Sequence, residues 1–126
     1  MQYVLTQGAQ GICPQDWHIP TTSEFIILRD YLGGSNVAGG KLKEAGFSHW
    51  DPPNTGATNE SGFTGLPGGL RTPTYFNPLG WMGHFWSSSQ DGSISAFRLA
   101  LFRDSAEGSI GATNKELGIS IRCIKD

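Results

Sequence analysis

The sequence is poor in charge and has no long hydrophobic run, and each shortage excludes a class of protein. Only 16% of the residues are charged, the formal net charge is −2, and Lys and Arg form no cluster. The chain therefore lacks the electrostatic footprint that attracts nucleic acid or anionic lipid, and we expect no nucleic-acid partner. No apolar run approaches the ~20 residues of a spanning helix, so we expect no direct insertion into a membrane.

An export signal is also missing. Residues 1–11 contain neither a basic n-region nor an apolar h-region, and residues 2–5 (QYVL) are typical of a strand. Because the chain begins abruptly with this strand-like run, we expect a domain excised from a longer protein, with its export signal upstream.

Cysteine is scarce: Cys13 and Cys123 are the only two, near opposite ends of the chain. A bond between them would close a loop of about 110 residues, stabilise the fold by up to ~4.7 kcal/mol in the chain-entropy model, and imply an oxidising compartment. The termini of compact domains are often close together, which makes this pairing reasonable. The alternative is two unpaired buried thiols, and the lack of Cys-x-x-Cys or His-Cys spacing argues against a metal site.

What the sequence has in abundance is glycine, with 18 residues, together with 4 tryptophans. This composition is typical of a loop-rich globular fold built on aromatic anchors, and not of a helical bundle. A chain of this length fits one domain that buries roughly two-thirds of the surface its unfolded form exposes. We therefore predict a single domain over residues 1–126.

One helix is clearly signalled at residues 23–32. Thr21 and Glu24 stand at capping-box spacing, and the glycines at 33–34 predict the helix end. Apolar residues recur along this segment at helical spacing, so one face is expected to pack inward. A shorter helical turn is predicted over 37–44, although its two central glycines each weaken it by ~1 kcal/mol relative to Ala.

The remaining chain predicts loops and short strands. Residues 47–69 are dominated by Pro, Gly, Asn, Thr and Ser, which indicates a long ordered loop. Short runs of strand-forming residues predict a small twisted antiparallel sheet packed against the helix, and hence an α+β fold. The predicted strands are 63–66, 84–88, 95–103 and 118–124.

Seven motifs carry a resemblance to a known family. They are GICP (11–14), WHIP (17–20), GGKLK (39–43), NTGATNESGF (54–63), LPGG (66–69), WSSS (86–89) and SIRC (120–123). In this order, they strongly resemble the Fibrobacter succinogenes major paralogous domain family, which is similar to the C-type-lectin-like superfamily close to its formylglycine-generating-enzyme-like group. The resemblance implies a C-type-lectin-like fold, a helix after the second motif, and a disulfide joining Cys13 to the last strand. It also implies a bacterial surface protein or lipoprotein, especially of Bacteroidetes. Four aromatic residues of the family-like segments are expected to anchor the core: Trp17, Trp50, Phe63 and Trp86.

An enzymatic function lacks candidate residues. Formylglycine-generating enzymes use active-site cysteines, but both cysteines here are best assigned to a structural bond. His18, His49 and His84 sit in separate segments without Glu-x-x-His or His-x-His spacing, and the serines at 87–89 lack the Gly-x-Ser-x-Gly elbow. We therefore predict a non-catalytic domain without a cofactor.

A structural calcium ion is one interpretation of the long loop. The triplets with which sugar-binding C-type lectins hold calcium are absent, but oxygen-bearing side chains cluster there, and calcium takes six to eight oxygen ligands. The alternative is that these side chains cap turns by bonding their own backbone. The candidates are Asp51, Asn54, Thr58, Asn59 and Glu60.

The C-terminal strands are the predicted ligand face. Along 95–103, alternation separates Phe97, Leu99 and Leu101 from Arg98, Ala100 and Phe102. With the leucine face inward, Phe102 is exposed beside two arginines. That is the composition of a binding hot spot, although a single exposed phenylalanine is also common.

Residues 91–117 depart most from the family's pattern, and in the related variable proteins of diversity-generating retroelements this part forms the diversified ligand surface. The resemblance thus suggests the ligand-binding residues Trp81, His84, Ser95, Arg98, Ala100, Phe102, Arg103 and Glu107. We predict an extracellular, adhesin-like domain of a bacterial surface, pilus or phage protein that binds a surface protein or glycan. The alternatives are a carbohydrate module that uses the long loop and a structural module of a surface assembly.

Overall fold

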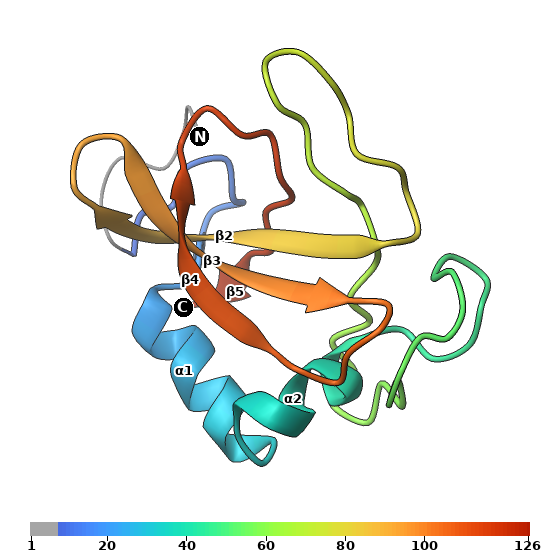
Figure 1. Cartoon of the computed structure of the whole chain (residues 1–126). Helices are drawn as coiled ribbons and strands as arrows, with labels where there is room; N and C mark the ends of the chain where they lie inside the picture. Colours follow the sequence, from blue (N-terminus) through green and yellow to red (C-terminus); the bar gives the residue numbers. More distant parts are fainter. Residues whose placement is uncertain (1–7) are drawn as a thin grey trace.

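The computed structural model describes residues 8–126 and has the predicted α+β architecture (Figure 1). The elements in chain order are β1 (Trp17–His18), α1 (Thr22–Tyr31), α2 (Ser35–Leu42), β2 (Met82–Asp91), β3 (Ser95–Phe102), β4 (Ser109–Asn114) and β5 (Ile124–Lys125). Strands β2, β3 and β4 form an antiparallel sheet in that order, and β1 pairs with β5. The strand predicted at residues 2–5 lies outside the described residues. Within residues 8–126, neither helix has the length and apolar character needed to cross a membrane.

Both predicted helices are present. The capping box forms at the start of α1: the N–H of Glu24 donates to Thr21 Oγ1 at 3.2 Å, and the N–H of Thr21 donates to Glu24 Oε1 at 3.1 Å. Helix α2 begins two residues before the predicted turn. Its two central glycines face main chain, because a Cβ at Gly39 or Gly40 would come within 1.9 or 2.2 Å of a carbonyl oxygen. Close packing thus offsets the low helix propensity of glycine here.

The core lies between the two helices and one face of the sheet, and Figure 1 shows both helices on that side. The leucine face of β3 points inward, as predicted. The core residues are Phe25, Leu32, Ala38, Leu42, Trp50, Phe85, Leu99 and Leu101, with Leu28, Phe63 and Ile110 packed against them.

Three of the four aromatic anchors are buried or packed against buried residues, with Trp50 and Phe63 in this core and Trp86 on the opposite face of the sheet, and one is not. Trp50 and Trp86 are each 1% exposed, and the ring of Phe63 packs edge-on against Phe85 at a centroid distance of 5.4 Å. The expectation for Trp17 is wrong, because its side chain is 39% exposed. Trp17 lies in the two-residue strand β1 opposite Lys125 of β5. In this segment Ile19 is fully buried instead.

Two predicted strands are also wrong. Residues 63–66 contribute only an isolated bridge between Gly65 and Lys43, and 118–124 contribute isolated bridges before joining β5 at Ile124. Ser120 pairs with Phe85 at the edge of β2, but this pairing covers one residue and does not continue along the strand. Strand β4, in contrast, was not predicted, because its sequence SIGATN is short, polar and interrupted by glycine.

Lys43, directly after α2, is a fully buried cation. Its Nζ donates three hydrogen bonds, to the carbonyl oxygens of Thr55 at 2.9 Å, Phe102 at 2.7 Å and Ser105 at 2.9 Å. Burial lowers the pKa of Lys43 to about 8, and the charge of Asp104 acts in the opposite direction. The ammonium therefore stays protonated at neutral pH and fastens the long loop to the end of β3.

We predict that Lys43→Met lowers the free energy of unfolding by about 3 kcal/mol or more, because three buried carbonyl oxygens lose their donor. Urea unfolding followed by tryptophan fluorescence measures this loss. The matched control is Lys41→Met, at a partly exposed lysine two residues earlier, which should change stability by less than ~0.5 kcal/mol. A Lys43→Met protein as stable as the wild type would contradict this role.

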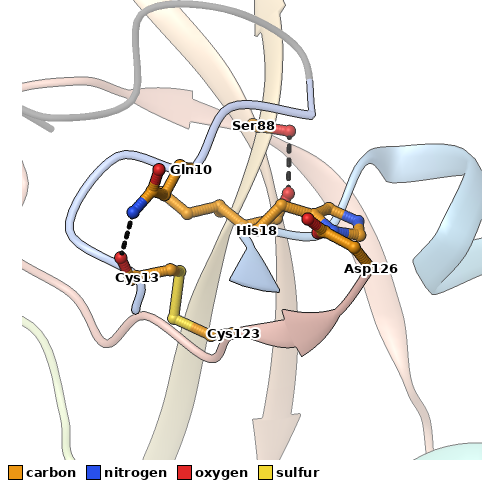
Figure 2. Close-up of a disulfide and its surroundings, with 7 residues drawn as sticks. Gln10, Cys13, His18, Ser88, Cys123 and Asp126 are labelled. Carbon is orange, nitrogen blue, oxygen red and sulfur yellow. Dashed lines mark hydrogen bonds and ion pairs between the residues drawn. A yellow bond between two sulfur atoms is a disulfide. The ribbon is translucent and has the colours of Figure 1, made fainter. Parts of the chain in front are cut away.

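The predicted disulfide between Cys13 and Cys123 is present, and it joins residues 110 positions apart (Figure 2). It packs with Ile19 and Ile121 in a second small core. A bond of this kind persists in an oxidising, non-cytoplasmic environment.

Beside the disulfide, His18 joins three parts of the chain. Its Nδ1 lies 2.7 Å from Asp126 Oδ1, and Figure 2 shows these two residues side by side. Its Nε2 lies 2.9 Å from Glu24 Oε1 in the capping box of α1. These hydrogen bonds, first to Asp126 and then to Glu24, raise the pKa of His18, against a smaller effect of burial. The imidazole therefore links β1, α1 and the C-terminal residue.

Because the pKa of His18 is raised on folding, its contribution to stability is complete below pH 6.5 and disappears as the pH rises through the raised value. We predict that wild type loses roughly 0.5–1 kcal/mol relative to His18→Gln between pH 6 and pH 9. Thermal unfolding at a series of pH values measures the difference. Asp126→Asn should retain about half of this pH-dependent difference in stability. Parallel pH curves for wild type and His18→Gln would show that His18 makes no such contribution to stability.

Candidate functional site

The candidate site is the face of β2 and β3 that points away from the helices. In the register of the sheet, His84 lies opposite Ala100 and Trp86 lies opposite Arg98. Directly paired residues share a face, so alternation correctly placed Arg98, Ala100 and Phe102 together and the sheet adds His84.

This face is more covered than alternation suggested. Ala100 is fully buried and His84 is 7% exposed, so the side chain of Ala100 cannot contact a ligand. Phe102 is only partly exposed, with its ring edge-on to His84 at a centroid distance of 6.1 Å. The expectation of an open aromatic at Phe102 is therefore wrong, because the cross-strand histidine covers it.

His84 is held neutral. Its Nε2 lies 3.1 Å from the sulfur of Met82. Burial, followed by the positive charge of Arg98, lowers the pKa of His84 to about 4. At pH 7 the imidazole therefore adds no charge to the face.

A histidine with a lowered pKa stabilises the fold at high pH, and this stability is lost as the pH falls from 6.5 towards 4, where the unfolded chain binds the proton first. We predict that His84 accounts for up to ~3 kcal/mol of the loss between pH 7 and pH 4. His84→Gln should show a correspondingly smaller loss in urea titrations at the two pH values. His49→Gln, at an exposed histidine, is the control and should behave as wild type; equal losses in all three proteins would refute the assignment.

Arg98 carries an isolated charge on the same face. Its side chain is partly buried, its Nη1 is fully buried, and it makes no hydrogen bond or ion pair with any residue in 8–126. Opposite it on β4 stands Gly111, where a Cβ would lie 3.5 Å from Nη1. Burial lowers the pKa of Arg98, although a guanidinium stays charged in proteins.

Trp81 and Arg103 are brought together at the end of the β2–β3 ladder. The Arg103 guanidinium lies 4.6 Å from the centroid of the Trp81 ring, and the N–H of Arg103 donates to the carbonyl of Trp81 at 3.0 Å. Trp81 is 44% exposed, so this cation–π pair is open to solvent.

Two predicted ligand-face residues lie elsewhere. Ser95 stands at the far end of β3, opposite Asp91 and Asn114, about 10 Å of strand from Arg98. Glu107 is exposed in the β3–β4 connection, where its carbonyl packs against Gly39 of α2. The structure thus separates Ser95 and Glu107 from the other residues of the predicted ligand face.

Sequence reasoning missed an apolar hollow beside the long loop. Leu66 and Leu79 are 44% and 65% exposed and line a cavity of about 340 Å³. The complete lining is Ser48, His49, Leu66, Pro67, Gly68 and Leu79. Only the density of apolar residues in a Pro/Gly-rich stretch could have indicated it, and that pattern does not separate a hollow from a core anchor.

The calcium candidates are occupied largely by turn bonds. Asn54 Nδ2 donates to the carbonyls of Glu44 and Gly46, and Asn59 Oδ1 accepts the N–H of Thr64 at 2.8 Å. Between residues 8 and 126, no three His, Cys, Asp or Glu side chains gather where they could hold a metal ion. The Asp51 carboxylate instead packs against Gly80, and Glu60 bonds locally to Thr58.

Comparison with known proteins gives one match. The family model described as the Fibrobacter succinogenes major domain matches residues 2–125. No curated protein and no solved structure matches the chain.

Proposed function

Because the chain belongs to the Fibrobacter succinogenes major domain family, we propose that it has a C-type-lectin-like fold and acts as a non-catalytic ligand-binding domain. The binding surface is the sheet face around Arg98 and Phe102, together with the Trp81–Arg103 pair. The domain is displayed outside the bacterial cell, on the cell surface, a pilus or a phage particle, and binds a surface protein or a glycan.

The observation that carries this proposal is the solvent-open Trp81–Arg103 pair. Trp and Arg are the residue types most enriched in binding hot spots. Because the two side chains already hold each other in place, a partner that binds them loses little further rotamer freedom. The hollow lined by Leu66 and Leu79 adds exposed apolar surface for a partner, and Leu79 is only two residues from Trp81 in the chain.

Other features support an extracellular and non-catalytic role. Both cysteines of the chain are joined in a disulfide, which suits an oxidising environment and leaves no thiol nucleophile. His18 and His49 bond to carboxylates, and His84 is buried against Met82. None of these histidines activates a hydroxyl nucleophile in the geometry described for residues 8–126.

A carbohydrate module using the long loop is the second candidate, and the hollow beside that loop favours it. His49 and Ser48 are the polar side chains that line it, and the cavity is of a size that holds a small ligand.

We predict that Trp81→Ala and Arg103→Ala each weaken ligand binding at least ~10-fold. A screen of the oxidised domain against glycan and surface-protein arrays, with calcium and then with a chelator, identifies the ligand for this test. Tyr31→Ala is the control, because Tyr31 is 86% exposed on α1. Unchanged melting temperatures must accompany the loss.

The screen also separates the alternatives. If calcium-dependent glycan binding survives both substitutions, the binding site is on the long loop and not on this surface. If no ligand binds on either array, a structural module is favoured.

A further inference from the structure

We propose that Arg98 is the subsite for an acidic group of the ligand, namely the carboxylate of an Asp or Glu side chain on a partner protein. This inference rests on the proposed binding function and names the chemistry that the sheet face recognises.

Arg98 differs from the other arginines of the chain in its contacts. Arg29 pairs with Asp30 at 3.3 Å, Arg122 donates to the carbonyl of Phe63 at 2.7 Å, and Arg103 stacks on Trp81. Arg71 is exposed. Arg98 alone combines partial burial with a buried Nη1 that no residue in 8–126 accepts. Residues 8–126 thus leave the charge of Arg98 without a counter-charge, which a carboxylate from outside this part of the chain can supply.

The sheet places no carboxylate beside Arg98. The three strands β2, β3 and β4 contain one Lys or Arg, which is Arg98, and one Asp or Glu, which is Asp91 at the end of β2. Asp91 lies opposite Ser95, three residues from Arg98 along β3. A ligand carboxylate at Arg98 would therefore meet an unopposed positive charge.

Access to Arg98 is partial. Its Nη1 is buried beside Gly111 on β4, so a ligand meets the part of the side chain that is not buried. The buried ring of Trp86 flanks Arg98 on β2 and lowers the local dielectric, which strengthens a charge pair. The planar fork of arginine matches a carboxylate through two parallel hydrogen bonds.

The surroundings of Arg98 favour a protein over an acidic sugar. A sugar ring carries hydroxyl groups that each need a donor or an acceptor. Among the neighbours on this face, Trp86, Ala100 and His84 are buried, and Phe102 is partly exposed. A ligand therefore meets one charge beside an apolar ring, with no exposed polar neighbour for sugar hydroxyls among these residues, which suits an acidic side chain flanked by apolar residues.

The test uses the oxidised domain with labelled arginines and follows the five Nε–Hε signals by NMR. The probes are the capped peptides acetyl-Phe-Glu-Phe-amide and acetyl-Phe-Gln-Phe-amide, with glucuronate as a sugar carboxylate. We expect the Glu peptide to shift the Arg98 signal saturably and the Gln peptide to bind at least ~10-fold more weakly. The exposed Arg71 is the internal control. Equal shifts at Arg71 and Arg98 would overturn the subsite, and a glucuronate affinity equal to that of the Glu peptide would overturn the choice of a protein ligand.

Variants separate binding from folding. Arg98→Met should abolish the Glu-peptide shift at the Gly111 amide and raise the melting temperature by ~3–6 °C, because an unpaired buried charge is removed. Arg98→Lys keeps the charge without the fork and should bind at least ~5-fold more weakly than wild type. Arg71→Met should match wild type in both measurements. Undiminished binding by Arg98→Met would refute the subsite.

The two proposals can fail separately. If the array ligand is lost with Trp81→Ala but kept with Arg98→Met, the binding surface stands and the acidic subsite falls. If Arg98 takes the Glu peptide while the arrays are silent and Trp81→Ala has no effect, the acidic subsite stands and the wider surface falls.

Discussion

The fold depends on one buried ammonium group. Lys43 draws together carbonyl oxygens from the long loop and from the end of β3, which would repel one another without a cation between them. The same junction positions the candidate site, since the N–H of Thr55 donates to the carbonyl of Arg103 and the N–H of Arg103 donates to Trp81. In many loop-rich proteins a calcium ion gathers backbone oxygens in this way. Here a side chain supplies the positive charge, so the cation is covalently part of the chain.

Sequence reasoning succeeded where the deciding interactions are local. The capping box of α1 spans four residues, and the alternation along β3 follows from the pleat of a single strand, so both are visible without knowledge of the fold. It failed where distant contacts decide. Trp17 is exposed because β1 pairs only with β5, and the segment 118–124 lacks a continuous partner strand. Lys43 has no distinguishing sequence signal, because only the fold brings three carbonyl oxygens around it.

The candidate site was predicted in outline and not in detail. Alternation placed Arg98 on the correct face, but it could not show that Ala100 is sealed by neighbouring chain or that His84 is held neutral. Those properties arise from packing across strands. Together they leave Arg98 as the charge on this face at neutral pH, and under the proposed function a partner without an acidic group would leave that charge unpaired.

The disulfide has a consequence for a domain that works under mechanical load. Cys13 and Cys123 hold their Cα atoms 5.9 Å apart, close to both ends of the described chain. Tension applied between residue 12 and residue 124 passes through this covalent link and largely bypasses the helices and the sheet. Stretching can therefore draw out only the short segments outside the link, while the 109 residues enclosed between the two cysteines carry almost none of the force. Under such a load the sheet and its exposed face would stay folded.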